Sequence, residues 1–299
     1  MAAVTDHHVQ PLVDESVFLG LGDRVAAHGT IGAAGREELV AALATYVETA
    51  RRLGAVEIGV VGTEPLRRAG DAARVIRDVE ARTGVALHVI EHEEEGRLTL
   101  LGVTMGRPIS SELLVIDVGG GSTEFVLGEP DGRVEAMGLR LGAARLTREL
   151  IVADPPTLAE VDAVRRAVAR IVEGAPDASP REIVAVGGTA SNLLRLMPAT
   201  AVDHVLTRRR LTVALAMLTV ERSTEAAERH VLRPARARVL PAGSLILDAI
   251  LERYGSDRMR VAEEGLREGL ALALAVAGPA WRDRLGIMVR GWELSGTTP

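Results

Sequence analysis

Residues 112–128, ELLVIDVGGGSTEFVLG, contain two apolar runs separated by three consecutive glycines. The runs Leu113–Ile116 and Phe125–Leu127 are short and continuous, which predicts two buried strands joined by a tight turn. One interpretation is a plain glycine turn between buried strands. The other is a site for phosphate and Mg²⁺, because glycines can adopt a positive φ that brings bare N–H groups against an anion. Asp117, at the end of the first strand, would then hold the hydrated cation.

The composition narrows the partners that such a site could serve. The 299 residues are 47% hydrophobic, which is enough for sizeable cores, but aromatic residues make up only 2% and offer few surfaces for stacking bases. The net charge of −6 gives no general attraction for polyanions, so a phosphate substrate needs a local arginine cluster. We therefore expect no nucleic-acid partner. The absence of cysteine and of a long apolar run predicts a cytoplasmic protein with no membrane partner.

The spacing of apolar residues predicts alternating helices and strands around this segment. A short strand is expected at 17–22, and the remaining elements are helix 36–52, strand 56–61, helix 71–82, strand 85–90, strand 134–138, helix 158–173 and strand 182–186. Strand 56–61 ends in Gly62, Thr63 and Glu64, with Arg67 in the turn or helix that follows. Because open α/β sheets bind ligands at strand ends, this loop is a second candidate for ligand binding.

Strand 85–90 is followed by the acidic run Glu91–Glu95, and the sequence shows no second histidine or acid at metal-site spacing from His92. One interpretation is that acids favour the first turn of a helix, where the macrodipole stabilises each by about 0.3–1 kcal/mol. The other is that one carboxylate faces a cleft, because successive helical residues point about 100° apart. Crowding by like charge would raise the pKa of that carboxylate and suit it to act as a general base.

A second glycine-rich turn, GGTASN at 187–192, directly follows strand 182–186 and precedes a helical segment. A glycine turn that leads into a helix N-terminus is an anion site, and two such turns favour phosphate binding over coincidence. The run Arg208–Arg210 is interpreted either as a solvated face or as a contact for a polyanion. Two other features have structural interpretations: Asp248 as the partner of an arginine, and GLREG at 265–269 as a contact between helices.

Together these motifs resemble those of the exopolyphosphatase and guanosine pentaphosphate phosphohydrolase (Ppx/GppA) family. The resemblance extends from about Val17 to Leu274, with the motifs in the family's order. The matching segments are GTEPLRRA at 62–69, VIEHEEEGRLTLLGV at 89–103, VIDVGGGSTE at 115–124, GLRLGAARLT at 138–147, VAVGGTASNL at 184–193, RVLPAGSLILDAIL at 238–251 and EEGLREGL at 263–270.

The resemblance implies an α/β fold with two RNase H-like domains of the actin, sugar kinase and heat-shock ATPase superfold. Residues 1–108 would form the first domain and residues 109–299 the second, with the last residues packing back on the first. The cleft between the domains would bind phosphates and Mg²⁺. The resemblance also implies a short form of the family, without its C-terminal helical domain, and makes a homodimer plausible.

The resemblance further implies a role for each matching residue. The catalytic base would be Glu95, the second catalytic acid would be Glu124, and the metal would be held by Asp117 and Glu124. The phosphate-binding positions would be Arg67, Arg97, Gly119, Gly120, Gly121, Ser122, Thr123, Gly187, Gly188 and Thr189. The implied reaction is the Mg²⁺-dependent release of terminal phosphate from inorganic polyphosphate or guanosine pentaphosphate, in which Glu95 removes a proton from the attacking water.

One departure from the family pattern concerns the N-terminus. The family begins with a strand, an Asp and a Gly-Ser-Asn-Ser turn that forms a first phosphate loop, and no such motif precedes Val17. Either the start lies further upstream, or the chain lacks this loop and the first hairpin of the fold. The second case favours an alternative function, a catalytically impaired regulator that binds polyphosphate or a guanosine alarmone. A kinase of the same superfold is disfavoured, because the acidic run suits activation of water.

Overall fold

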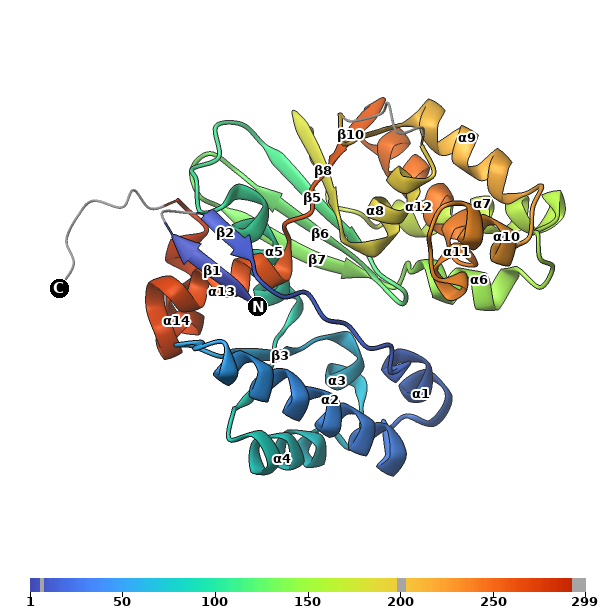
Figure 1. The fold of residues 1–299 in the computed structure, drawn as a ribbon. Helices are drawn as coiled ribbons and strands as arrows, with labels where there is room; N and C mark the ends of the chain where they lie inside the picture. The colour runs from blue at the N-terminus through green and yellow to red at the C-terminus, as the bar shows by residue number, and fades with distance from the viewer. Residues whose placement is uncertain (6–7, 198–202, 292–299) are drawn as a thin grey trace. The chain divides into compact units, whose positions relative to one another are not determined.

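The computed structural model describes residues 1–5, 8–197 and 203–291, and the chain divides into two compact units (Figure 1). Unit 1 comprises Met1–Arg107 together with the segment that begins at Leu266. Unit 2 comprises Pro108–Gly265. Each unit has a buried apolar core of its own.

Unit 2 is built on a mixed six-stranded sheet with the order β7-β6-β5-β8-β10-β9. Strand β5 pairs parallel with β8 and antiparallel with β6, and β8 pairs parallel with β10. The predicted strands around 113–128, 134–138 and 182–186 are therefore confirmed. The six strands are β5 (Leu113–Val118), β6 (Thr123–Gly128), β7 (Val134–Leu139), β8 (Glu182–Val186), β9 (Val205–Thr207) and β10 (Arg258–Val261).

The helices of unit 2 gather beside this sheet (Figure 1). They are α6 (Ala143–Leu150), α7 (Leu158–Val172), α8 (Gly187–Arg195), α9 (Arg208–Leu218), α10 (Ser223–Arg229), α11 (Pro234–Ala237) and α12 (Leu240–Arg253). Their apolar faces form one core with Leu114, Ile116 and Phe125 of the sheet, which are fully buried. Burial of this apolar surface, rather than helix propensity, stabilises the unit.

The arginine run at the start of α9 forms ion pairs within unit 2. Arg208 Nε donates to Asp248 Oδ1 at 2.9 Å, and Arg210 Nη1 donates to Asp203 Oδ1 at 2.7 Å. The hydrogen bond to Asp248 raises the pKa of Arg208 above its ordinary value. The prediction that Asp248 pairs with an arginine is confirmed, and the contacts of Arg208 and Arg210 agree with a structural interpretation of the run.

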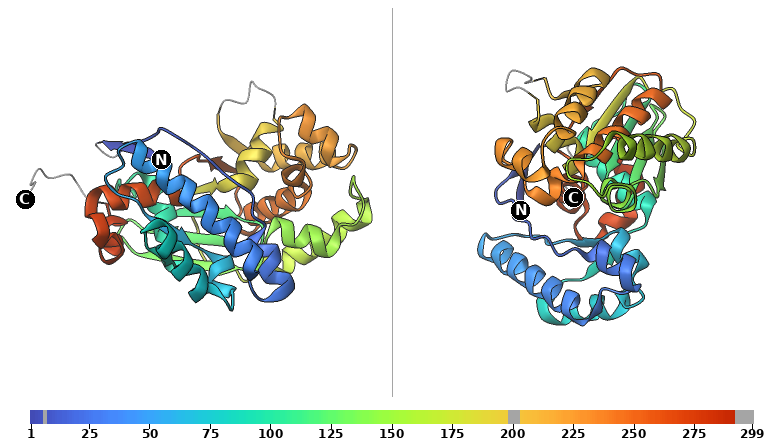
Figure 2. Two further views of the ribbon diagram at one scale, coloured as in Figure 1. Left: turned by 60° about the horizontal axis from the view of Figure 1, so that its bottom comes forward. Right: turned by 90° about the vertical axis from the view of Figure 1, so that its right-hand side faces the viewer.

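Unit 1 contains two separate pairs of strands. Strand β1 (Ala2–Thr5) pairs antiparallel with β2 (His8–Pro11), and β3 (Val60–Gly62) pairs parallel with β4 (Leu87–Val89). The helices are α1 (Leu21–His28), α2 (Gly32–Arg52), α3 (Glu64–Arg68), α4 (Ala72–Thr83), α5 (His92–Thr104), α13 (Leu266–Ala277), a 3₁₀ turn (Gly278–Ala280) and α14 (Trp281–Met288). Helices α2 and α4 pack side by side (Figure 2).

Two sequence-based expectations for unit 1 are corrected by the structure. The strand expected at 17–22 does not form, because Gly20 adopts a left-handed conformation (φ 59°) from which α1 begins. The strand expected at 56–61 is limited to Val60–Gly62, because its ladder extends only along the three residues of β4. Neither outcome depends on the apolar pattern of the segment itself.

Helix α13 packs against α5 through the GLREG motif, as predicted. A Cβ added at Gly269 would overlap the carbonyl oxygen of Leu98 in α5, so the two backbones approach closely only because residue 269 is glycine. Among residues 1–5, 8–197 and 203–291, no helix combines the length and apolar character that crossing a bilayer requires.

Gly269→Ala is expected to lower the free energy of unfolding by about 1–3 kcal/mol, because α13 must move away from the Leu98 carbonyl. The matched control is Gly286→Ala in α14, where the added methyl group would have its nearest neighbour, Arg97 Nη1, at 3.9 Å. This control should gain up to about 1 kcal/mol from helix propensity. Chemical denaturation measures both variants, and equal stability of the two would contradict this account of the packing.

Candidate active site

The turn between β5 and β6 is closed by one hydrogen bond, from Gly119 N to the Ser122 carbonyl oxygen at 2.9 Å. The expectation of positive φ in this turn is wrong, since none of the three glycines adopts it. Gly120 and Gly121 are exposed, and their N–H groups have no acceptor among the residues that the structure describes. The turn therefore presents two backbone donors to solvent, which is the property that phosphate binding requires.

The start of α6 lies against this turn. Ala143 N donates to the Gly119 carbonyl at 3.0 Å, and Arg145 N donates to the Gly120 carbonyl at 2.9 Å. A Cβ at Gly142 would overlap the backbone of Gly120. The helix amides thus fix the carbonyl side of the turn and leave its N–H side available for an anion.

Asp117 and Glu124 are directly opposed in the β5–β6 ladder, so their side chains lie on the same face of the sheet. Ser122 Oγ donates to Glu124 Oε1 at 2.6 Å and orients that carboxylate. A Cβ at Gly187, the first residue of α8, would overlap the Asp117 carboxyl group. Two adjacent carboxylates, one of them seated against a glycine, are a hard oxygen donor set that fits Mg²⁺.

The second glycine-rich turn lies next to the first, because Asp117 and Val186 are partners in the parallel β5–β8 ladder. Helix α8 starts at Gly187, whose φ is 81°, so positive φ occurs in this turn rather than in the triple glycine. Gly188 is exposed. Thr189 Oγ1 is buried and donates to the Val118 carbonyl at 2.7 Å, which ties α8 to the end of β5.

Thr123 has a similar structural contact. Its side chain is fully buried and its hydroxyl donates to the Leu141 carbonyl oxygen. This bond ties β6 to the segment that leads into α6, and the phosphate-binding role of Thr123 stays a prediction. The sequence-predicted residues of unit 2 are thus gathered at the adjacent ends of β5 and β8, where open α/β sheets bind ligands.

In unit 1 the structure brings Arg67 and Glu95 together. Arg67 Nη1 donates to Glu95 Oε2 and to the Ile90 carbonyl oxygen, both at 2.7 Å, and Arg67 Nη2 lies 3.1 Å from His92 Nδ1. The Arg67 and Glu95 side chains are only 9% and 15% exposed. One guanidinium therefore connects the end of β4 to the first turn of α5 and holds the Glu95 carboxylate in one orientation.

The remaining acids of the run have partners of their own. Glu91 and Glu94 form a capping box at the start of α5, which confirms the helix-start interpretation for these two residues. Glu93 pairs with Arg97 at 2.6 Å, so the ion pair of Arg97 lies along its own helix, and its phosphate-binding role stays a prediction. Within the run, the other carboxylates are directed to other partners and do not crowd Glu95.

Two residues with a bearing on the site were missed by the sequence analysis. Gly142 lies inside a quoted motif, but nothing in its neighbours indicates contact with the triple glycine. Arg282 in α14 bonds Glu94 with both Nε and Nη2 and follows an ordinary helical pattern. Its hydrogen bond lowers the pKa of Glu94 below its ordinary value. Only proximity in the folded chain identifies these residues.

Comparison with known proteins places this arrangement in a family. A model of the Ppx/GppA phosphatase family matches residues 1–276. The exopolyphosphatase 1 of Mycobacterium tuberculosis H37Rv is 29% identical over 281 residues, which cover 89% of this chain and 80% of that protein. The exopolyphosphatase 2 of the same strain is 31% identical over 292 residues, covering 87% and 88%.

A solved structure of the Aquifex aeolicus Ppx/GppA family member is similar over 93% of each chain, with a TM-score of 0.80 and 28% identity. This likeness confirms the predicted α/β fold with two RNase H-like domains of the actin, sugar kinase and heat-shock ATPase superfold. The match over most of the sequence and the match in fold agree with each other. The chain therefore belongs to the Ppx/GppA phosphatase family.

Proposed function

We propose that this chain is an Mg²⁺-dependent phosphohydrolase that releases terminal phosphate from inorganic polyphosphate or from guanosine pentaphosphate. The observation that carries the proposal is the pair Asp117 and Glu124 beside the exposed amides of Gly120 and Gly121. Carboxylates suit a divalent cation and bare amides suit a phosphate, so one end of β5 offers both halves of a metal–phosphate site. Membership of a phosphatase family supports this chemistry.

The residues of each unit have distinct tasks in this proposal. Asp117 and Glu124 would hold Mg²⁺, which when bound neutralises charge on the phosphate oxygens. The N–H groups of Gly120 and Gly121 donate to the terminal phosphate and orient it for attack. Glu95 accepts the proton of the attacking water at Oε1, because Oε2 is bound by Arg67.

Two candidate substrates follow from different parts of the comparison. The mycobacterial relatives named exopolyphosphatase favour inorganic polyphosphate. The GppA part of the family name, which stands for a guanosine pentaphosphate phosphohydrolase, favours guanosine pentaphosphate. Both substrates present a terminal phosphoanhydride, so the contacts described here serve either. A homodimer located in the cytoplasm, with no nucleic-acid or membrane partner, stays a prediction.

The test is phosphate release from each substrate by the purified chain, with Mg²⁺ and with excess chelator. Release is expected with Mg²⁺ and should fall at least about 100-fold on chelation, since the cation contributes several kcal/mol of charge stabilisation. Release that is unaffected by chelation would contradict the metal assignment. Binding of either substrate with no phosphate release from polyphosphate or from guanosine pentaphosphate would contradict the enzyme proposal. It would support the alternative of a catalytically impaired regulator.

A further inference from the structure

The junction between β4 and α5 is held by two arginines from different parts of unit 1. Arg67, on α3, donates to the Ile90 carbonyl and to Glu95. Arg282, on α14, donates to the Val89 carbonyl at 3.3 Å and to Glu94 Oε2 at 2.7 Å. Each guanidinium therefore connects one backbone carbonyl at the end of β4 to one carboxylate in the first turn of α5.

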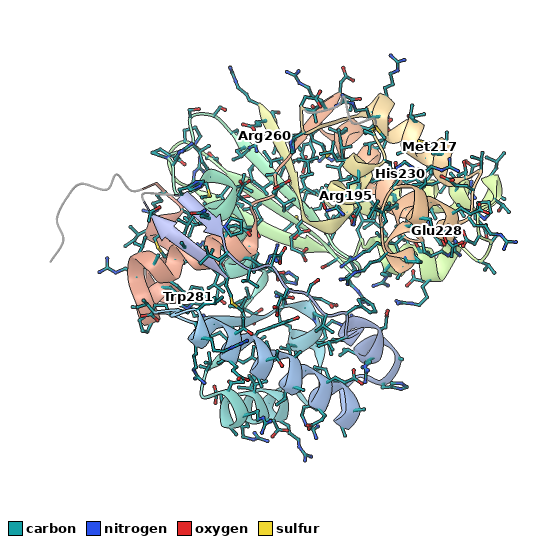
Figure 3. All side chains as sticks on the ribbon, viewed as in Figure 1. Arg195, Met217, Glu228, His230, Arg260 and Trp281 are labelled. Carbon is teal, nitrogen blue, oxygen red and sulfur yellow. The ribbon has the colours of Figure 1, made fainter. Side chains whose placement is uncertain are left out.

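The position of Arg282 is fixed because α14 is anchored in unit 1. Trp281, labelled in Figure 3, is 2% exposed, and its ring lies edge-on to His88 of β4 with centroids 6.1 Å apart. Leu285 and Met288 are also buried. The backbone that carries Arg282 is therefore set by apolar packing, and its side chain reaches Glu94 from a defined point.

Glu94 transmits this restraint to the start of α5. Its Oε2 also accepts from the Glu91 N–H at 3.0 Å, which closes the capping box, and Glu95 N donates to the Glu91 carbonyl at 2.9 Å. The bidentate contact with Arg282 fixes the Glu94 carboxylate in the orientation that the box needs. The first helical turn, which carries Glu95, is thereby tied to α14, and the two contacting residues, Glu94 and Arg282, are 188 positions apart in the chain.

We propose that Arg282 is a positioning residue for the catalytic base: through Glu94 it fixes the first turn of α5 and so the placement of the Glu95 carboxylate. This inference rests on the proposed function of Glu95. Arg67 orients the carboxylate by direct contact, whereas Arg282 sets the backbone from which Glu95 projects. The segment after Leu266 thus contributes to the geometry of the base without contacting it.

The test uses full-length Arg282→Gln and Arg282→Lys with Arg284→Gln as the control. Both arginines are exposed on the same helix, but only Arg282 has a hydrogen bond or ion pair with the residues that the structure describes. Arg282→Gln should lower kcat for phosphate release about 10-fold, with KM within about 2-fold, since misplacing a base slows the chemical step more than binding. Arg282→Lys should lose less, because it keeps the charge but not the two-point contact. Arg284→Gln should match wild type.

A second measurement separates this inference from the proposed function. Hydrogen exchange of the amides of residues 92–96 should be about 10-fold faster in Arg282→Gln than in wild type, since Glu94 loses the contact that orients it in the capping box. Unchanged exchange and unchanged kcat would overturn the inference even if wild type releases phosphate. A lower kcat accompanied by faster amide exchange throughout unit 1, and not mainly at residues 92–96, would show a general loss of stability. That result would also overturn the inference. If wild type proves inactive, the proposed function fails and exchange alone decides the inference.

Discussion

Glu95→Gln should reduce kcat for phosphate release by about 10²–10⁴-fold, the range associated with losing a general base. Glutamine keeps the size of the side chain, and its amide oxygen can still accept from Arg67. It cannot accept a proton from water at pH 7. The fold of unit 1 should therefore be preserved while the attacking water loses its base.

Steady-state kinetics of phosphate release, together with a thermal unfolding curve, measures this effect. The matched control is Glu93→Gln, which removes one negative charge from the same turn of α5 at a side chain that is 58% exposed. Glu93→Gln should change kcat by no more than a few-fold, because charges at exposed positions are screened. If the two variants retain equal activity, Glu95 is not the base.

Gly187→Ala is expected to weaken Mg²⁺ binding and lower activity, each by about 10–100-fold, the effect seen when groups that orient metal ligands are altered. The added methyl group would overlap the Asp117 carboxyl, which must then move from its place beside Glu124. The φ of 81° at this position also opposes any L side chain, at a cost of about 1–2 kcal/mol in stability.

The activity at increasing Mg²⁺ concentration, and direct titration of the metal by calorimetry, measure this variant. Gly255→Ala separates backbone strain from displacement of Asp117. Its φ is 61° and an added Cβ would have no neighbour within 4 Å, so it should lose stability but keep its Mg²⁺ affinity. Equal Mg²⁺ affinity in the two variants would contradict the role of Gly187 in seating Asp117.

Several elements of the fold and site follow from short-range sequence alone. The apolar runs of 113–116 and 125–127 with glycines between them predict two strands joined by a turn, which the structure contains. The glycines that follow residue 186 mark the end of strand 182–186 in the same way. The acidic run at 91–95 predicted a helix start because the capping box and the macrodipole act within one turn. Such features depend on neighbours in the chain, so they can be predicted from it.

Other features were decided by contacts between distant segments. The pattern at 56–61 is that of a buried strand, but its length was set by β4. The need for glycine at 142 and 187 arises from the backbone of Gly120 and the carboxyl of Asp117, both far away in sequence. Arg282 has an ordinary place in a helical pattern, and its contact with Glu94 exists because α14 packs against α5.

The sequence by itself thus determined several of the strands and helices and which segments carry the chemical groups, because hydrophobic period, turns and caps are local. The tertiary structure alone decided which glycines are indispensable and which arginine orients which carboxylate. Steric overlap and hydrogen bonding act over a few ångströms in space, and these distances join residues that no local pattern relates.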